Sequence, residues 1–281
     1  MPLKVITDST CDLPAQLVKD LGITVIPLKV LFGEEVYTEG VDITNQEFYS
    51  KMEEHKELPK TAQANPSEFV DEFNKHLRNG DEVLGIFISS KLSGTYSSAV
   101  IAKDMLNDNR INLIDSEFAT FGLGLLVAEA AEMARDGKSA PEIVERIEKV
   151  KREMHFYGAI NTLENLKKGG RLTTTSAIAG TFLGIKPIIT IKNGSVELLS
   201  KARGLKKAFT WMLEDAIKNG ADLNSKTVYL AHAENPEGLE DLKQMILARF
   251  KPQRIIECEI GSVVGTHTGV GCVGFCCLKD D

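Results

Sequence analysis

Residues 82–114 are EVLGIFISSKLSGTYSSAVIAKDMLNDNRINLI, which contain two strand-like runs separated by a loop and a helical pattern. The apolar run at 82–88 is typical of a buried strand, residues 94–107 fit a helix, and residues 111–114 fit the next strand. A strand, a helix and a second strand in this order predict a βαβ unit. We therefore expect an α/β fold with a mostly parallel sheet.

The same alternation continues on the N-terminal side of this stretch and immediately after it. Strands are expected at residues 3–7 and 23–31, and Asp12 before Pro14 predicts a helix that ends near Gly22. The remaining helix starts are marked by capping boxes, by Asn-Pro or by apolar periodicity. They predict helices at residues 45–55 (Thr44 with Glu47), 66–79, 121–135 and after Ser139 with Glu142.

The pattern changes after residue 153, which predicts a second, mixed α/β domain. Asn193-Gly194 lies between strand-like residues 185–191 and 196–201, and this dipeptide is a strong signal for an antiparallel hairpin. The rest of this half predicts helices at 205–219 and 236–250 and strands at 227–231, 254–260 and 271–278. We expect an N-terminal domain at 1–153, a C-terminal domain at 154–281 and a ligand crevice between them.

Length and charge exclude several classes of protein. The chain has 281 residues, more than the roughly 100–200 of one ordinary domain. It carries 33 Lys and Arg against 40 Asp and Glu, a net charge of -7, so nucleic acid is not an expected partner. The N-terminus has no signal-like apolar run, and the apolar tracts at 118–131 and 178–191 fit buried core better than a membrane span. A cytoplasmic location is expected.

The five cysteines predict neither a disulfide framework nor a metal site. Their number is odd and no C-x-x-C pair occurs. Cys272, Cys276 and Cys277, together with His267, resemble a ligand set only in composition, because the cysteines lie in an apolar run typical of a buried strand. We expect reduced thiols and no cofactor.

The loop at 89–98 has the composition of an anion-binding site. It follows a strand and enters a helix, so backbone N–H groups at the helix start face outward, Gly94 permits close approach and Ser93 adds a hydroxyl donor. The alternative is that Ser93 or Thr95 only caps the helix. A nucleotide is disfavoured, because the P-loop string is absent and the G-x-G-x-x-G at 269–274 lacks the following helix.

A second candidate group is His267, which lies in the string GTHTG at residues 265–269. These glycines predict a loop rather than a helix, with backbone that can approach a bound group closely. A neutral imidazole could donate a hydrogen bond to a carboxylate. The alternative is a structural histidine that ties the loop together.

Three further loops contain polar candidates. Asp8 and Ser9 follow the first strand, and strand ends are where open α/β sheets bind ligands. Thr61 precedes a helix, and Arg171 follows a Gly-Gly break that could direct it into a crevice. Each of them also has an ordinary reading, as a turn residue for Asp8 and Thr61 and as a surface cation for Arg171.

Five short strings in this order resemble the DegV family of bacterial fatty-acid-binding proteins, and the resemblance covers essentially the whole chain. They are TDST at 7–10, Thr61 with Gln63, SGTY at 93–96, GRL at 170–172 and GTHTG at 265–269. The chain departs from the family where Ala62, Ala64, Val270 and Cys272 replace other small residues. These departures leave the hydroxyls and the histidine in place and concern loop shape and chain-length preference.

The resemblance implies two α/β domains with one fatty acid in a tunnel between them. Its carboxylate contacts fall on Thr61 and Ser93, with Gly94 and His267 beside them. Arg171, Asp8 and Ser9 correspond to supporting positions near the head group, and Arg171 and Arg203 to positions for partner docking. Residues 118–131 and 178–183 supply small and apolar side chains for a tunnel wall.

The resemblance also implies that the chain is a carrier and not an enzyme. A separate ATP-dependent fatty-acid kinase would convert the bound carboxylate to an acyl phosphate, and a transient contact with a membrane surface is compatible with this role. For a tail of about sixteen carbons, burial at about 0.8 kcal/mol per CH₂ gives on the order of 12 kcal/mol before the costs of association. The tail supplies affinity and the head group supplies position.

The alternative is a serine hydrolase or acyltransferase. In that reading Ser93 is the nucleophile, His267 the base and Asp8 the residue that orients the base. No G-x-S-x-G string occurs, and the order Asp, Ser, His matches none of the familiar triads. The carrier is therefore the expected function.

Overall fold

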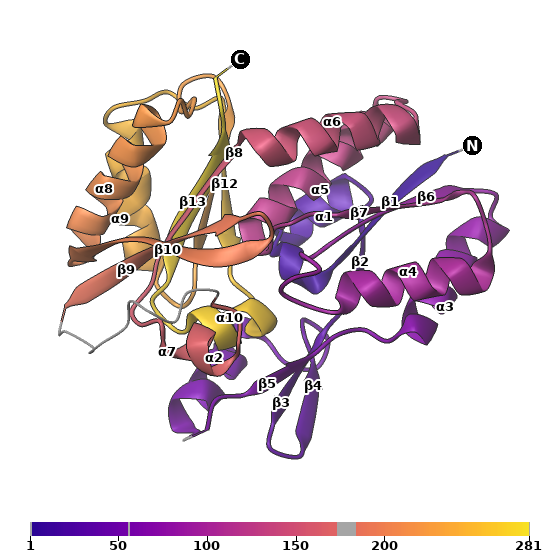
Figure 1. Ribbon diagram of the computed structural model, residues 1–281, viewed down its shortest axis with the longest axis horizontal. Helices are drawn as coiled ribbons and strands as arrows, with labels where there is room; N and C mark the ends of the chain where they lie inside the picture. The colour runs from indigo at the N-terminus through magenta and orange to yellow at the C-terminus, as the bar shows by residue number, and fades with distance from the viewer. Residues whose placement is uncertain (1, 56, 173–183, 281) are drawn as a thin grey trace.

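The computed structural model describes residues 2–55, 57–172 and 184–280. It is an α/β protein with two domains, each built on its own sheet (Figure 1). Glu153 ends the last helix of the first part and Met154 begins the first strand of the second. We propose that the domain boundary lies between these two residues.

The N-terminal sheet is parallel, as expected, with strand order β2-β1-β6-β7. Alternate residues of its strands face two separate cores: Ile6, Val83 and Phe87 face one, and Val5 and Leu84 face the other. Helices cover both faces (Figure 1). The strands are β1 (Leu3–Asp8), β2 (Thr24–Ile26), β6 (Glu82–Phe87) and β7 (Ile111–Asp115), with α3 (Pro66–Arg78) and α4 (Thr95–Leu106) on one face and α5 (Thr120–Arg135) on the other.

A third, antiparallel sheet was not expected from the sequence. It has the order β4-β3-β5 and consists of β3 (Lys29–Phe32), β4 (Glu35–Thr38) and β5 (Lys60–Ala62). The prediction of one strand over residues 23–31 is wrong, because the chain leaves the parallel sheet at Pro27, which cannot donate a ladder hydrogen bond. The Leu28 N–H instead donates to Ser9 Oγ at 2.9 Å.

The C-terminal sheet is mixed, with strand order β10-β9-β8-β13-β11-β12. The predicted hairpin is confirmed: Asn193 and Gly194 have φ of 49° and 79°, the left-handed values that a tight two-residue turn requires. The strands are β8 (Met154–Ala159), β9 (Ile185–Lys192), β10 (Ser195–Arg203), β11 (Thr227–His232), β12 (Arg254–Glu259) and β13 (Val273–Leu278), with α8 (Leu205–Lys218) and α9 (Pro236–Leu247) on one face.

Helix α5 joins the two domains into one core. It packs against β1 and β6 of the first sheet and against β11 and β13 of the second. Phe121 of α5 stacks on Phe156 of β8, with ring centroids 4.4 Å apart and planes 5° from parallel. The predicted apolar tract at 118–131 is therefore mostly buried core between the sheets.

Most predicted helices are confirmed, and one prediction about a helix is wrong. The capping boxes of Thr44, Asn65 and Ser139 are present. Residues 265–269, expected to be a loop, lie mainly in α10 (Ser262–Thr268), and the short α7 was not predicted. The other helices are α1 (Ala15–Asp20), α2 (Asn45–Glu54), α6 (Ala140–Glu153) and α7 (Glu164–Lys168).

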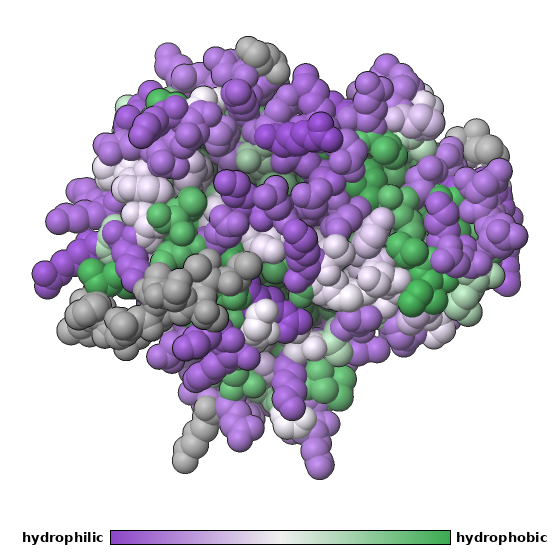
Figure 2. All heavy atoms as spheres, viewed as in Figure 1, coloured by the Kyte–Doolittle hydropathy of each residue, from purple (hydrophilic) through white to green (hydrophobic). Residues whose placement is uncertain are grey.

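The surface seen in Figure 2 is mostly hydrophilic, and apolar side chains gather on it over α4. Ile101 and Met105, one turn apart on that helix, are 49% and 65% exposed. Among the helices that the structure describes, none is both long and apolar enough to cross a membrane.

Candidate functional site

A cavity lies between the two domains where β6 ends. Its volume is about 820 Å³ when the open solvent at its mouth is included. Polar groups come from both domains and are Thr61, Gln63, Ser93, Gly94, Thr120, Arg171, His267 and Thr268. The apolar lining includes Leu28, Ile88, Leu92, Ala119, Phe156, Leu166, Ile189, Ile191, Val196, Val263 and Val264.

Thr61 and His267 meet in this cavity although they are 206 residues apart in the chain. Thr61 is in β5 and His267 is near the end of α10, and Thr61 Oγ1 lies 3.3 Å from His267 Nε2. Burial, and secondly the charge of Arg171, lowers the pKa of His267 to about 4. The imidazole is therefore neutral near pH 7 and can donate one hydrogen bond.

His267 Nδ1 faces the chain at Gly169. A side chain at Gly169 would bring its Cβ to 2.3 Å from Nδ1, so only glycine leaves room for the imidazole. In the described part of the chain Nδ1 has no hydrogen-bond partner. The triad that the hydrolase alternative requires is consequently not assembled, because no carboxylate orients His267.

Ser93 and Gly94 lie at the start of α4. Ser93 Oγ is 2.9 Å from Thr95 Oγ1 and accepts from the Thr95 N–H at 3.3 Å in a turn before the helix. The alternative that Ser93 or Thr95 is the N-cap is wrong, because Gly94 occupies that position. Gly94 precedes the helix without a side-chain cap. A Cβ at Gly94 would lie 2.0 Å from Gln63 Oε1, so glycine allows Gln63 to reach this helix start.

Arg171 connects the C-terminal domain to the loop that holds Ser93. Its Nε donates to the Leu92 carbonyl at 3.1 Å, and its Nη1 donates to the Gly169 carbonyl. The guanidinium lines the cavity and places a permanent positive charge beside His267. Arg203, by contrast, is exposed at the end of β10 and does not line the cavity.

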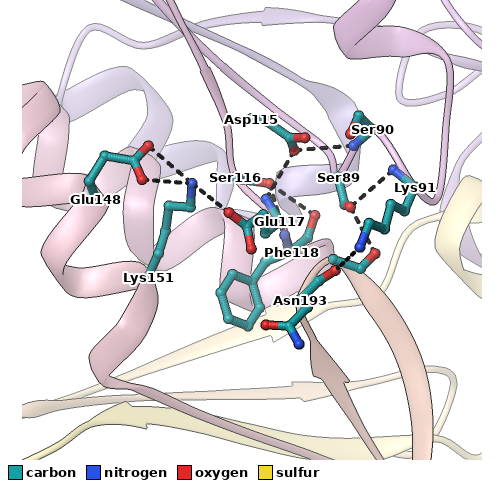
Figure 3. A network of polar contacts seen from close by, with 11 residues as sticks. Ser89, Ser90, Lys91, Asp115, Ser116, Glu117, Phe118, Glu148, Lys151 and Asn193 are labelled. Carbon is teal, nitrogen blue, oxygen red and sulfur yellow. Dashed lines mark hydrogen bonds and ion pairs between the residues drawn. The ribbon is translucent and has the colours of Figure 1, made fainter.

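The tip of the β9–β10 hairpin rests on the same loop (Figure 3). Ser89 Oγ donates to the Gly194 carbonyl at 2.8 Å, and Lys91 Nζ donates to the Asn193 carbonyl at 2.8 Å. These contacts hold β9 and β10 over the cavity, where Ile189, Ile191 and Val196 form part of its wall.

Asp8 and Ser9 support the site from behind and do not line the cavity. Asp8 Oδ2 accepts from the Ile88 N–H at 2.8 Å, and Asp8 Oδ1 accepts from the Thr10 N–H at 3.0 Å. Asp8 thus fixes the end of β6, from which the loop to Ser93 begins. The Ser9 hydroxyl accepts from the Leu28 N–H, two residues after β2 ends.

Burial raises the pKa of Asp8 to about 6, against opposing hydrogen bonds from Thr10 and Ile88. Between about pH 4 and pH 6 the folded state holds a proton that the unfolded state has released. The contribution of Asp8 to stability is therefore present at low pH and is lost as the pH rises through 6. The difference in free energy of unfolding between wild type and Asp8→Asn should change by about 3 kcal/mol over this window.

Urea unfolding followed by circular dichroism at pH 4 and pH 7 measures this difference. Asp71→Asn is the matched control, because Asp71 is exposed on α3. The control should follow the pH dependence of wild type. An Asp8→Asn protein with the same pH dependence as wild type would show that Asp8 has an ordinary pKa.

Thr120 was not identified from the sequence. It lines the cavity, its side chain is buried, and its hydroxyl lies beside the Asp12 carboxyl. Its φ of 50° is uncommon for a β-branched residue. The only sequence signal was its position at the start of a long apolar helix, which is equally typical of core. The expected wall at residues 178–183 lies outside the described residues.

The chain resembles known proteins over nearly its whole length. Residues 2–280 match the family described as "Uncharacterised protein, DegV family". A DegV domain-containing protein of Clostridium acetobutylicum is 41% identical over 276 residues, covering 97% of this chain and 96% of the relative. Protein DegV of Bacillus subtilis is 32% identical, covering 99% of this chain and all of its own length.

Two solved structures share the fold. A DegV family protein from Thermus thermophilus, described with fatty-acid binding, has a TM-score of 0.92 and 32% identity, with full coverage of both chains. DegV from Bacillus subtilis, described as a fatty acid binding protein, has a TM-score of 0.86 and 31% identity, covering 99% of this chain and 100% of its own.

Proposed function

Because the chain belongs to the DegV family, we propose that it binds one long-chain fatty acid in the cavity between its domains. The carboxylate contacts Thr61, Ser93, Gly94 and His267, and the acyl chain lies among the apolar residues. The observation that carries the proposal is one cavity in which Thr61 and His267, from the two domains, meet beside a wall of aliphatic and aromatic side chains.

The polar groups suit a single small anion. Thr61 and Ser93 supply hydroxyl donors, neutral His267 supplies one N–H, and the start of α4 supplies backbone N–H groups. Arg171 is the cation in the lining, so the carboxylate charge has a counter-charge nearby. Among its described residues the lining has one arginine and no lysine, which suits a carboxylate better than a polyphosphate.

The apolar residues supply the binding free energy. Residues such as Ile189, Ile191 and Phe156 form an apolar wall, and transfer of an acyl chain from water to such a wall is favourable. About 0.8 kcal/mol for each buried CH₂, summed over a chain of about sixteen carbons, exceeds what a few hydrogen bonds contribute. The head-group residues then fix which end of the molecule lies at the start of α4.

We further propose that a separate ATP-dependent kinase phosphorylates the bound carboxylate to an acyl phosphate. In that reaction the nucleophile is a carboxylate oxygen of the ligand, and this protein positions it for in-line attack on the γ-phosphate. Arg203 is exposed and free of the cavity, so it suits contact with an acidic partner surface. Arg203→Glu should slow turnover by the kinase without changing fatty-acid affinity.

Denaturing mass spectrometry of the purified protein tests the central proposal. We expect about one fatty acid per chain in the extract, and a delipidated sample should take up added oleate or palmitate. A protein purified from lipid-containing cells that is empty, and that takes up neither acid, would contradict the proposal.

A further inference from the structure

The start of α10 is held by three side chains of the N-terminal domain. Tyr49 donates its hydroxyl to the Ile260 carbonyl at 2.7 Å, and Asp12 Oδ1 accepts from the Gly261 N–H at 3.0 Å. Glu39 Oε1 accepts from the Ser262 hydroxyl at 2.9 Å and from the Val263 N–H at 2.8 Å. Four hydrogen bonds thus cross from one domain to a segment of four residues in the other.

The contact continues along the helix. A Cβ at Gly265 would lie 2.4 Å from the Tyr49 hydroxyl, so glycine lets the helix pack directly on Tyr49. The sequence prediction of a loop here failed because this glycine serves close packing, while Glu39 and Ser262 stabilise the helix start. His267 lies five residues after Ser262, at the end of α10 that faces the cavity.

The two carboxylates lie close together. A Cβ at Gly261 would be 2.5 Å from Glu39 Oε1 and 3.0 Å from Asp12 Oδ1, so both oxygens border the same point. Glu39 is 7% exposed, and its second oxygen, Oε2, is buried without a partner in the described part of the chain, while the Thr120 hydroxyl lies beside the Asp12 carboxyl. The described residues that line the adjoining groove include no lysine, arginine or histidine.

Two buried carboxylates without a cation cannot both be ionised at low cost. Burial, and secondly the charge of Glu39, raises the pKa of Asp12 well above its usual range. A proton on Asp12 leaves its Oδ1 able to accept from Gly261. It also gives the carboxyl a hydrogen to donate, for which the neighbouring Thr120 hydroxyl is an acceptor.

We propose that Asp12, which carries a proton at neutral pH, forms with Glu39 and Tyr49 a clamp that positions α10 and thereby His267. This inference rests on the proposed function, because His267 is the part of α10 that meets the ligand. Asp12 and Glu39 are positioning residues and do not touch the fatty acid. The other titratable groups that face the pair are Asp8 on β1, Cys11 beside Asp12, Tyr49 on α2, and Cys258 and Glu259 on β12.

These neighbours supply no positive charge. Burial raises the pKa of Cys11, Tyr49 and Cys258, so each remains neutral near pH 7. Asp8 and Glu259 are acids and add negative charge when they ionise. A proton is therefore the charge compensation that the described surroundings leave to the pair.

Variants of Glu39 test the positioning role. Glu39→Gln keeps an oxygen that can accept from Ser262 and Val263, whereas Glu39→Ala removes it. We expect Glu39→Ala, which loses two hydrogen bonds to α10, to weaken oleate binding by roughly tenfold, and Glu39→Gln to restore most of the affinity. The imidazole NMR signals of His267 should shift in the ligand-free Ala variant and stay close to wild type in the Gln variant.

Glu34→Ala is the matched control, since Glu34 is exposed in the same three-stranded unit. A folded Glu39→Ala protein with wild-type oleate affinity and unchanged His267 signals would overturn the clamp while leaving the proposed function intact. If wild type itself bound no fatty acid, the proposed function would fail, and the His267 signals would still report on the clamp.

Carbon-13 NMR of the Asp12 carboxyl tests the proton on Asp12, and it uses the folded wild-type protein. We expect the chemical shift of a protonated carboxyl at pH 7. Folding would then take up one proton at Asp12, so the ratio of the folding equilibrium constants of wild type and Asp12→Asn should fall tenfold for each unit of pH above about 4, with the contribution of Asp8 common to both proteins. An Asp12 carboxyl that is already ionised at pH 7 would refute this proton.

Discussion

The double variant Thr61→Val, Ser93→Ala is expected to bind oleate at least about 100-fold more weakly than wild type, because it loses two hydroxyl donors to a charged carboxylate. Each such hydrogen bond contributes about 1.5–3 kcal/mol. Thr61 lies in β5 beside His267 and Ser93 precedes α4, so the variant removes both hydroxyl donors that the N-terminal domain offers the carboxylate and leaves His267 of the C-terminal domain in place. Isothermal titration calorimetry with delipidated protein measures the affinity.

Ser97→Ala is the control for this variant, because Ser97 is exposed on the first turn of α4 and does not line the cavity. It should bind oleate as wild type does. The double variant should also keep weak binding, since the acyl chain still finds its apolar wall. Wild-type affinity in a folded double variant would show that the carboxylate lies elsewhere.

The parallel N-terminal sheet was predictable because its strands and helices are adjacent in the sequence. Residues 82–114 contain a complete βαβ unit, and both its strands and α4 are where the pattern places them. The three-stranded sheet was not predictable in this way. Its strands have three or four residues, and β5 pairs with β3 across an intervening helix, so no local periodicity marks them.

The head-group residues were recognisable as polar groups in unusual loops, but their association was not. Thr61 and His267 are 206 residues apart, and only the fold brings them within 3.3 Å. Physical reasoning from the residues supported an anion site at Ser93, and the family strings added Thr61 and His267. In the sequence Asp8 looks like a residue that could contact a ligand. In the structure its carboxylate lies behind the loop and accepts from the Ile88 N–H.

The apolar wall could not be distinguished from ordinary core. Ile189, Ile191 and Val196 are buried apolar residues of a hairpin, and such residues form the same pattern in the sequence whether they face protein or ligand. The clamp on α10 was equally hidden, since Asp12 marks a helix start in the sequence and Glu39 belongs to none of its motifs. Their hydrogen bonds to α10 become visible only in three dimensions.

Phe156→Ala is expected to lower the free energy of unfolding by about 3–5 kcal/mol, the usual cost of removing a buried phenylalanine. Phe156 is 5% exposed and stacks on Phe121, and Phe118 lies 6.1 Å away between ring centroids. The same ring forms part of the cavity wall, so its removal joins new space to the acyl site. The variant should therefore prefer longer fatty acids than wild type.

Two measurements separate these effects. Urea unfolding gives the loss of stability, and mass spectrometry after competition among saturated acids of increasing length gives the preference. Phe250→Ala is the control, because Phe250 is only partly buried, packs on α8 and α9 and is remote from the lining. It should leave the preferred length unchanged. A Phe156→Ala protein that loses stability but keeps the wild-type preference would mean that Phe156 contacts α5 and not the acyl chain, since added space at the ligand must favour the acid that fills it.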